Sequence, residues 1–93
     1  MSDVADRTEP FRVIIDAEEM KGLARVENEL TRFLRDFPGD AQQIAVLERL
    51  KVRADNWAKN DISRFLLLRV DSKLQHLRGR AKHGLDGPVK RAA

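Results

Sequence analysis

The first half of the chain has a helical pattern of hydrophobic residues that ends at a clear turn signal. Upstream of the turn, hydrophobic residues recur every three or four positions, which places them on one face of an α-helix. Pro38 and Gly39 interrupt this pattern, because proline disfavours the helical conformation of the residue before it. Asp40 and Gln43 then have the spacing of an N-terminal helix cap. The pattern predicts a helix over about 17–37, a turn, and a second helix that begins at Asp40.

A second hydrophobic stripe keeps its helical phase over residues 44–68, which predicts one long helix over about 40–79. Asn60 and Asp61 lie within this helix, although both residue types are common as helix caps. The alternative is therefore a break near 60–61, after which the chain would form a third helix.

Further apolar residues lie near the opposite side of the long predicted helix. These residues are Leu66, Val70, Leu74 and Leu77. A helix over 40–79 is about 60 Å long, roughly twice the length of the first helix, so one neighbour cannot cover both of its sides. We therefore predict an all-α helical hairpin with a long second helix, which dimerises through these four residues into a four-helix-bundle-like assembly. A monomeric three-helix bundle broken near 60–61 is the alternative, because its third helix would cover the same residues from within the chain.

Residues 10–16 fit either a strand or the start of a helix. Their β-branched residues favour a strand, as in a ribbon-helix-helix DNA-binding protein, whereas Thr8 as a cap and Pro10 in a first turn favour a helix. Asp16 and Glu19 have the spacing of a capping box, which predicts that the first long helix begins here.

The predicted domain organisation has three parts. Residues 1–9 form a flexible N-terminal tail, residues 10–82 form one helical domain, and residues 83–93 form a flexible basic C-terminal tail. The last boundary is placed where the helical periodicity is lost and glycines become frequent.

The composition supports a small helical domain and excludes several classes of protein. The 93 residues suit one domain, and the 35% of charged residues suit helices with broad solvated faces. The absence of cysteine excludes disulfides and thiolate metal sites. The N-terminus is too polar for a secretory signal, and the longest apolar run, Phe65 to Leu68, is far shorter than a membrane span. We expect a cytoplasmic protein without membrane association.

The net charge of +3 conceals an uneven distribution along the chain. Residues 1–39 carry a net charge of −3, residues 40–71 carry +1, and residues 72–93 carry +5. The basic residues of the last segment are Lys73, Arg78, Arg80, Lys82, Lys90 and Arg91. They are candidates for contacts with nucleic-acid phosphates, or with the acidic first third of another subunit.

The sequence offers little equipment for catalysis. His76 and His83 lie seven residues apart, too far for one metal ion held by residues of adjacent helical turns. No serine has glycine neighbours typical of a nucleophile turn, and no glycine-rich phosphate-binding motif is present. We expect no enzyme activity, cofactor, metal or small-molecule substrate. The predicted function is a regulatory, adaptor or assembly module that binds protein through the apolar face of its second helix, and the alternative is nucleic-acid binding through the basic segment.

Overall fold

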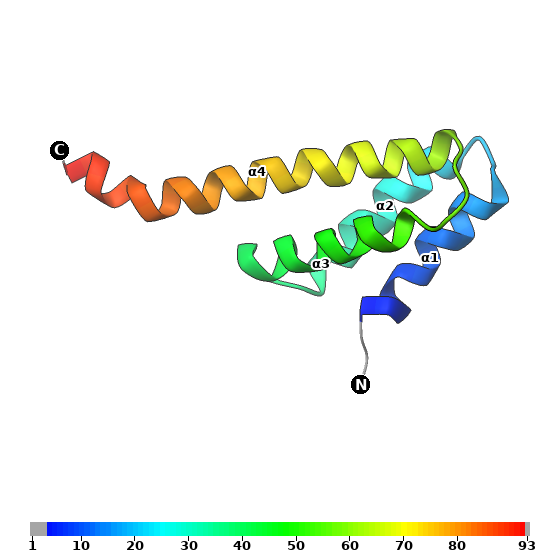
Figure 1. Ribbon diagram of the computed structural model, residues 1–93, viewed down its shortest axis with the longest axis horizontal. Coiled ribbons are helices and arrows are strands. Elements are labelled where there is room, and N and C mark those ends of the chain that lie inside the picture. Colours follow the sequence, from blue (N-terminus) through cyan, green and yellow to red (C-terminus); the bar gives the residue numbers. More distant parts are fainter. Residues whose placement is uncertain (1–3, 93) are drawn as a thin grey trace.

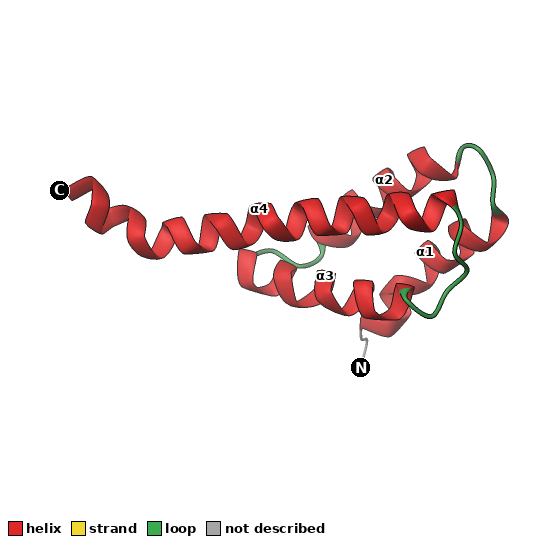
Figure 2. Cartoon of the chain, turned by 45° about the horizontal axis from the view of Figure 1, so that its top comes forward, coloured by secondary structure: helices red, strands yellow, loops and turns green. Residues whose placement is uncertain are grey.

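The computed structural model describes the backbone of residues 4–92 and the side chains of residues 7–80. Its four α-helices, shown in Figure 1, are α1 (Val4–Ala17), α2 (Gly22–Arg35), α3 (Asp40–Ala54) and α4 (Asp61–Ala92). Residues 4–92 contain no strand, so the prediction of an all-α chain is confirmed. The main contacts join the helices in the order α1, α2, α4, α3 around a shared core, α1 also touches α4, and Figure 2 shows the same arrangement from another side.

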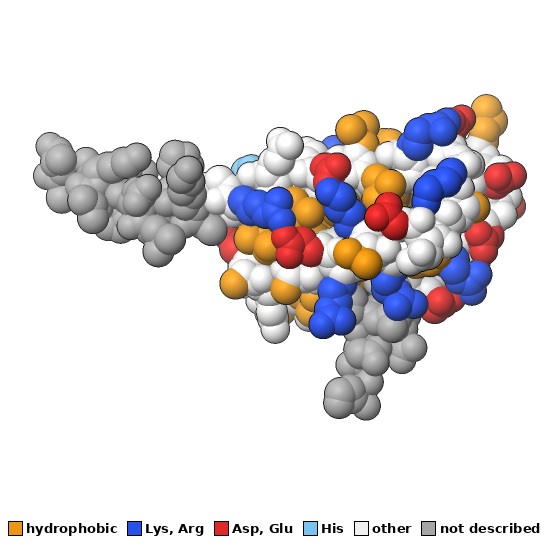
Figure 3. Space-filling model, in the orientation of Figure 1, with side chains coloured by type: hydrophobic (Ala, Val, Ile, Leu, Met, Phe, Trp, Pro, Cys, Tyr) orange, Lys and Arg blue, Asp and Glu red, His pale blue; other side chains and the backbone are white. Residues whose placement is uncertain are grey.

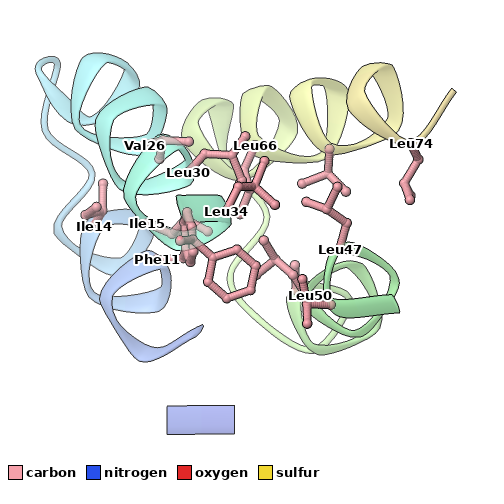
Figure 4. Close-up of a cluster of buried hydrophobic side chains, with 14 of the residues drawn as sticks. Phe11, Ile14, Ile15, Val26, Leu30, Leu34, Leu47, Leu50, Leu66 and Leu74 are labelled. Atoms are coloured by element: carbon pink, nitrogen blue, oxygen red, sulfur yellow. The ribbon is translucent and has the colours of Figure 1, made fainter. Parts of the chain in front are cut away.

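The core takes large apolar side chains from all four helices (Figure 4). Those that are fully buried include Phe11, Ile15, Val26, Leu30, Leu47, Leu50, Leu66 and Val70. The rings of Phe11 and Phe33 meet edge to face, with their centroids 5.5 Å apart, which joins α1 to α2. A single copy of the chain therefore encloses its own core.

Residues 10–16 are helical, and the ribbon-helix-helix alternative is wrong because α1 replaces its strand. Phe11, Ile14 and Ile15 are buried whereas Val13 is 55% exposed, which is the burial pattern of a helix face and not of an alternating strand. Burial of this face overrides the strand preference of the β-branched residues. α1 also includes residues 4–9, which the sequence assigned to a flexible tail.

The helix predicted over 17–37 is two helices. α1 ends at Ala17 and α2 begins at Gly22, so Asp16 is not a cap but lies in the last turn of α1, 2.9 Å from Arg12. The chain leaves α1 through Glu18, whose φ of 54° lies in the left-handed region. Packing of α1 on both α2 and α3 requires this reversal, and no proline marks it in the sequence.

The turn predicted at Pro38 and Gly39 is present between α2 and α3. Gly39 has a φ of 104°, a conformation that costs little only for glycine. Gln43 reaches back across the turn and donates a hydrogen bond of 3.3 Å to the carbonyl oxygen of Leu34. α3 begins at Asp40, as predicted, but the predicted cap is wrong, because Gly39 is the N-cap residue and no side chain caps the helix.

The long helix predicted over 40–79 is also wrong, because the chain is not helical between Ala54 and Asp61. The break lies where the three-helix alternative placed it, although the chain has four helices because the first predicted helix is divided as well. The hydrophobic residues keep their helical spacing on both sides of the break because α3 and α4 each direct an apolar face at the same core.

The predicted dimer interface is buried inside the single chain. Leu66, Val70, Leu74 and Leu77 are 0%, 0%, 2% and 5% exposed, respectively, because α2 and α3 both pack on α4. The inference that one copy leaves these residues uncovered is therefore wrong, and no second copy is needed to bury them. α4 continues to Ala92, and the basic tail predicted over 83–93 lies outside the described side chains.

Candidate binding site

Asn60 connects the start of α4 to the end of α1. Its side-chain oxygen accepts a hydrogen bond of 2.9 Å from the backbone N–H of Ser63, and its own N–H donates to the Ser63 hydroxyl at 2.9 Å. This reciprocal pair caps the N-terminus of α4. The side-chain amide of Asn60 donates to the carbonyl oxygen of Ile15 at 3.0 Å and to a carboxylate oxygen of Glu18 at 3.1 Å. One residue therefore holds the α1–α2 loop against the α3–α4 loop.

A pocket of about 300 Å³ lies between these two loops, at the end of the molecule where both are seen in Figures 1 and 2. We call it the head pocket. Its apolar lining consists of Met20, Leu23 and Ile62, and its polar lining consists of Glu18, Glu19, Asn60 and Asp61. The pocket combines residues more than forty positions apart in the sequence, and the hydrogen bonds of Asn60 fix the distance between its walls.

The apolar side of the head pocket exposes hydrophobic surface to solvent. Met20 is 95% exposed and Leu23 is 41% exposed, whereas Ile62 is 5% exposed and connects the pocket to the core. The sequence pattern places Met20 on the apolar face of a helix, but it lies in the α1–α2 loop outside both helices. Exposed methionine is common at surfaces that bind flexible apolar partners, because its side chain adapts to their shape.

The polar side of the head pocket carries three carboxylates, and no cation is among the described residues that line it. Cations lie behind two of them: Glu19 is 3.5 Å from Arg25 and 4.0 Å from Lys21, and Asp61 pairs with Arg64. Figure 3 shows acidic side chains at this end of the molecule. Glu18 has no ion-pair partner among the side chains of residues 7–80, so the pocket places one unpaired carboxylate and two paired ones beside an apolar wall.

Two of the predicted nucleic-acid-binding residues are engaged in ion pairs with α3. Arg78 pairs with Glu48, and Arg80 lies 3.1 Å from Asp40. Lys73 is half-buried and has no ion-pair partner among the side chains of residues 7–80. The other three predicted residues, Lys82, Lys90 and Arg91, lie outside the described side chains. In the face shown in Figure 3, acidic and basic side chains alternate over α3 and α4.

A second concave region, of about 400 Å³, lies between α1 and α2. Val13 contributes exposed apolar surface, and α2 contributes Arg25 and Arg32 with Glu29 between them. Because Glu29 opposes the two arginines, the charge of this groove selects neither an anionic nor a cationic ligand.

Neither a group of metal ligands nor a membrane-spanning helix occurs among the described residues. Within that part of the chain, no group of three histidine or acidic side chains is placed to hold a metal ion. No helix there combines the length and the apolar character required to cross a bilayer. Comparison with protein-family models, with curated proteins and with solved structures finds no match for this chain.

Sequence reasoning identified only part of this site. Asn60 and Asp61 carry a visible signal, since a pair of cap-forming residues inside a helical pattern marks a candidate break. Glu18 and Met20 carry no signal of a loop, because glutamate and methionine are both good helix formers and fit the helix predicted there. The pocket depends on the meeting of two loops, which no local pattern reports.

Proposed function

We propose that this protein is a non-enzymatic protein-interaction module, and that its head pocket binds an apolar segment of a protein partner that carries lysine or arginine. The observation that supports the proposal is the position of Met20, which is 95% exposed and lines the head pocket together with three carboxylates. The predicted surface on the second helix is not retained, because its four residues are buried in the core.

The chemistry of the pocket favours such a segment for two reasons. Covering exposed apolar side chains such as Met20 removes them from water, which is worth about 25 cal/mol for each Å² buried. Carboxylates at the rim accelerate the approach of cationic partners and discriminate against anionic ones. The volume of about 300 Å³ is at the lower end for small-molecule sites, and it suits one or two anchoring side chains of a peptide.

Binding can be followed through Trp57, the one tryptophan of the chain, which lies three residues before the pocket residue Asn60. The probe is a synthetic helical peptide of leucine and lysine, and its control is the same peptide with glutamate in place of lysine. We expect the lysine peptide to change Trp57 fluorescence and the glutamate peptide to leave it unchanged.

Met20→Ser should weaken binding of the lysine peptide at least about tenfold, because the exposed methionine supplies much of the buried apolar area. Val52→Ser is the matched control, since Val52 is 65% exposed on α3 outside the head pocket. Both variants should retain the stability of the wild type to within about 0.5 kcal/mol, as exposed sites usually do. Equal binding by the two variants, or equal binding of the two peptides, would refute the proposal.

Nucleic-acid binding is the second candidate function, favoured by the extension of α4 beyond the other helices in Figure 1. The sequence of this extension includes Lys82, Lys90 and Arg91. A gel-shift titration at low and moderate salt tests it, because phosphate contacts weaken as salt rises. Asp40→Asn, which releases Arg80 from its ion pair, should then strengthen binding. The absence of a shift at low salt removes this candidate.

A further inference from the structure

We infer that the head pocket of one copy binds residues 81–93 of a second copy, so that two chains form a closed antiparallel pair. This inference rests on the proposed function of the head pocket and names its occupant. It differs from the dimer predicted from the sequence, whose interface residues are buried in the core.

The segment over 81–93 has the chemistry that the head pocket selects. Its sequence, AKHGLDGPVKRAA, contains three basic residues and one acidic residue, together with the apolar residues Leu85 and Val89. Lys90 and Arg91 directly follow Val89, so that an apolar side chain and two cations are adjacent. The pocket presents an apolar wall next to Glu18, Glu19 and Asp61, which complements this pairing.

The segment cannot reach the head pocket of its own chain. The pocket includes the first residues of α4, whereas residues 81–92 form the other end of the same helix. A helix of 32 residues is about 48 Å long, and Figure 1 shows its two ends at opposite ends of the molecule. Residues 81–92 add about 18 Å of helix beyond Arg80, which lies 3.1 Å from Asp40 of α3.

In an antiparallel arrangement, each copy places its residues 81–93 in the head pocket of the other, so the same contact is made twice. Because the pocket and the segment lie at opposite ends of α4, a two-fold axis across this helix brings each segment to the partner's pocket. The two α4 helices would then meet along the side that faces away from the core. The residues on that side are Leu68, Ser72, Gln75 and Gly79. They are separated by four, three and four positions, which is the spacing of residues at a contact between two helices.

This outer side of α4 has two features that the single chain does not explain. Leu68 is 66% exposed although it lies in the middle of the helix. Gly79 is a glycine inside a helix, which costs about 1 kcal/mol relative to alanine, yet a Cβ atom there would meet nothing within 4 Å. Close approach of a second helix accounts for both, because it covers the leucine and uses the space that the glycine leaves.

The test is the mass of the full chain in solution, measured by sedimentation over a range of protein and salt concentrations. We expect a reversible change from 10.7 kDa to twice that mass. Met20→Ser and the double substitution Lys90→Glu/Arg91→Glu should each lower the association constant about tenfold or more. Val52→Ser and Arg49→Glu, at exposed positions of α3 outside the pocket, are the matched controls and should leave it unchanged.

A charge exchange makes the test specific to the head pocket. Glu19→Lys should weaken self-association of one protein, and Lys90→Glu should weaken that of another, because each places like charges in contact. A mixture of the two variants should form a mixed pair more tightly than either variant pairs with itself. A monomer at all concentrations, masses that grow beyond the pair, or a mixture no tighter than its components would overturn the inference.

Failure of this inference is distinct from failure of the proposed function. A chain that stays monomeric while its Trp57 responds to the leucine–lysine peptide overturns the second copy as occupant and leaves the proposed function standing. A chain that neither associates nor binds that peptide refutes both.

Discussion

Asn60 is the residue on which the geometry of the head pocket depends, and its removal should destabilise the whole chain. Asn60→Ala deletes the cap of α4 and removes one of two donors to the carbonyl oxygen of Ile15, which keeps the backbone N–H of Glu18 at 3.2 Å. The expected loss in the free energy of unfolding is about 1–3 kcal/mol, since a cap alone contributes about 1 kcal/mol. Urea denaturation followed by circular dichroism measures this change.

Asn56→Ala serves as the matched control for Asn60→Ala. Asn56 is exposed in the same loop, and its backbone N–H donates a hydrogen bond of 3.0 Å to the carbonyl oxygen of Arg53. An alanine retains that bond. If both variants lost the same stability, the side chain of Asn60 would not hold the loops together.

Two helical glycines should respond in opposite ways to the same substitution. A Cβ atom at Gly22 would lie 2.6 Å from Cδ1 and 3.2 Å from Cγ1 of Ile62, so Gly22→Ala forces α2 and α4 apart or moves a core side chain. We expect it to be neutral or to lower stability by up to about 2 kcal/mol, because overpacking exceeds the gain in helix propensity.

Gly79→Ala meets open space within the single chain, so it should raise stability by about 1 kcal/mol through helix propensity. Thermal unfolding of both variants at a protein concentration below that of any association makes the comparison. Stabilisation by Gly22→Ala as large as that by Gly79→Ala would show that α2 and α4 do not approach as closely as the structure has them.

At the scale of the helix, α4 has one buried side and one exposed side, and substitution by aspartate should lower stability on the buried side only. Val70→Asp places a carboxylate among core residues, because Val70 is 0% exposed, and should lower stability by more than about 3 kcal/mol. Leu68→Asp, on the opposite side and 66% exposed, should change it by less than about 0.5 kcal/mol.

Circular dichroism of the two α4 variants at low protein concentration provides the measurement. A folded Val70→Asp protein would contradict the burial of this helix inside a single chain.

α1 carries an electrostatic contribution whose pH dependence can be derived. Arg12 donates hydrogen bonds of 3.0 and 2.7 Å to Glu9, and these bonds lower the pKa of Glu9 below its ordinary value of 4.5. A carboxylate with a lowered pKa in the folded state stabilises the fold above its unfolded pKa, and this stabilisation is lost as the pH falls through the folded pKa. Glu9→Gln should therefore reduce the acid dependence of stability below about pH 4.5. An unchanged slope in acid denaturation curves would contradict this role.

Local sequence signals predicted an all-helical chain but not the number of its helices or all of their boundaries. The turn at Gly39 was predictable because a proline and a positive-φ glycine act within four residues. The turn at Glu18 was not, because a non-glycine residue there has a positive φ and its carboxylate bonds to Asn60, forty-two residues away. The apolar residues of α4 were recognised correctly, but whether their cover comes from the same chain or from another depended on the break after Ala54. The head pocket could not be predicted from the sequence, because the positions of both of its walls depend on tertiary contacts.

At the scale of the whole molecule, ion pairs between helices neutralise part of the basic charge that the sequence places near its C-terminal end. Lys51 with Asp71, Glu48 with Arg78 and Asp40 with Arg80 connect α3 to α4. Each exposed pair contributes between 0 and about 1 kcal/mol, so these pairs align the helices more than they stabilise them. The basic end of the sequence is thus partly neutralised by α3 within the same molecule.

The whole molecule should unfold in one cooperative transition, because no two of its helices form a separate core. Arg53 of α3 donates a hydrogen bond of 2.9 Å to the hydroxyl of Thr8 in α1, and Arg69 of α4 lies 3.0 Å from Glu27 in α2. These contacts join the two halves of the chain around the shared core. Trp57 packs against that core from the α3–α4 loop, so its fluorescence reports tertiary structure while circular dichroism reports all the helices. The two signals should give the same urea midpoint and the same m-value. A fluorescence transition that precedes the loss of helix would show instead that α3 and α4 separate from α1 and α2 before the helices unfold.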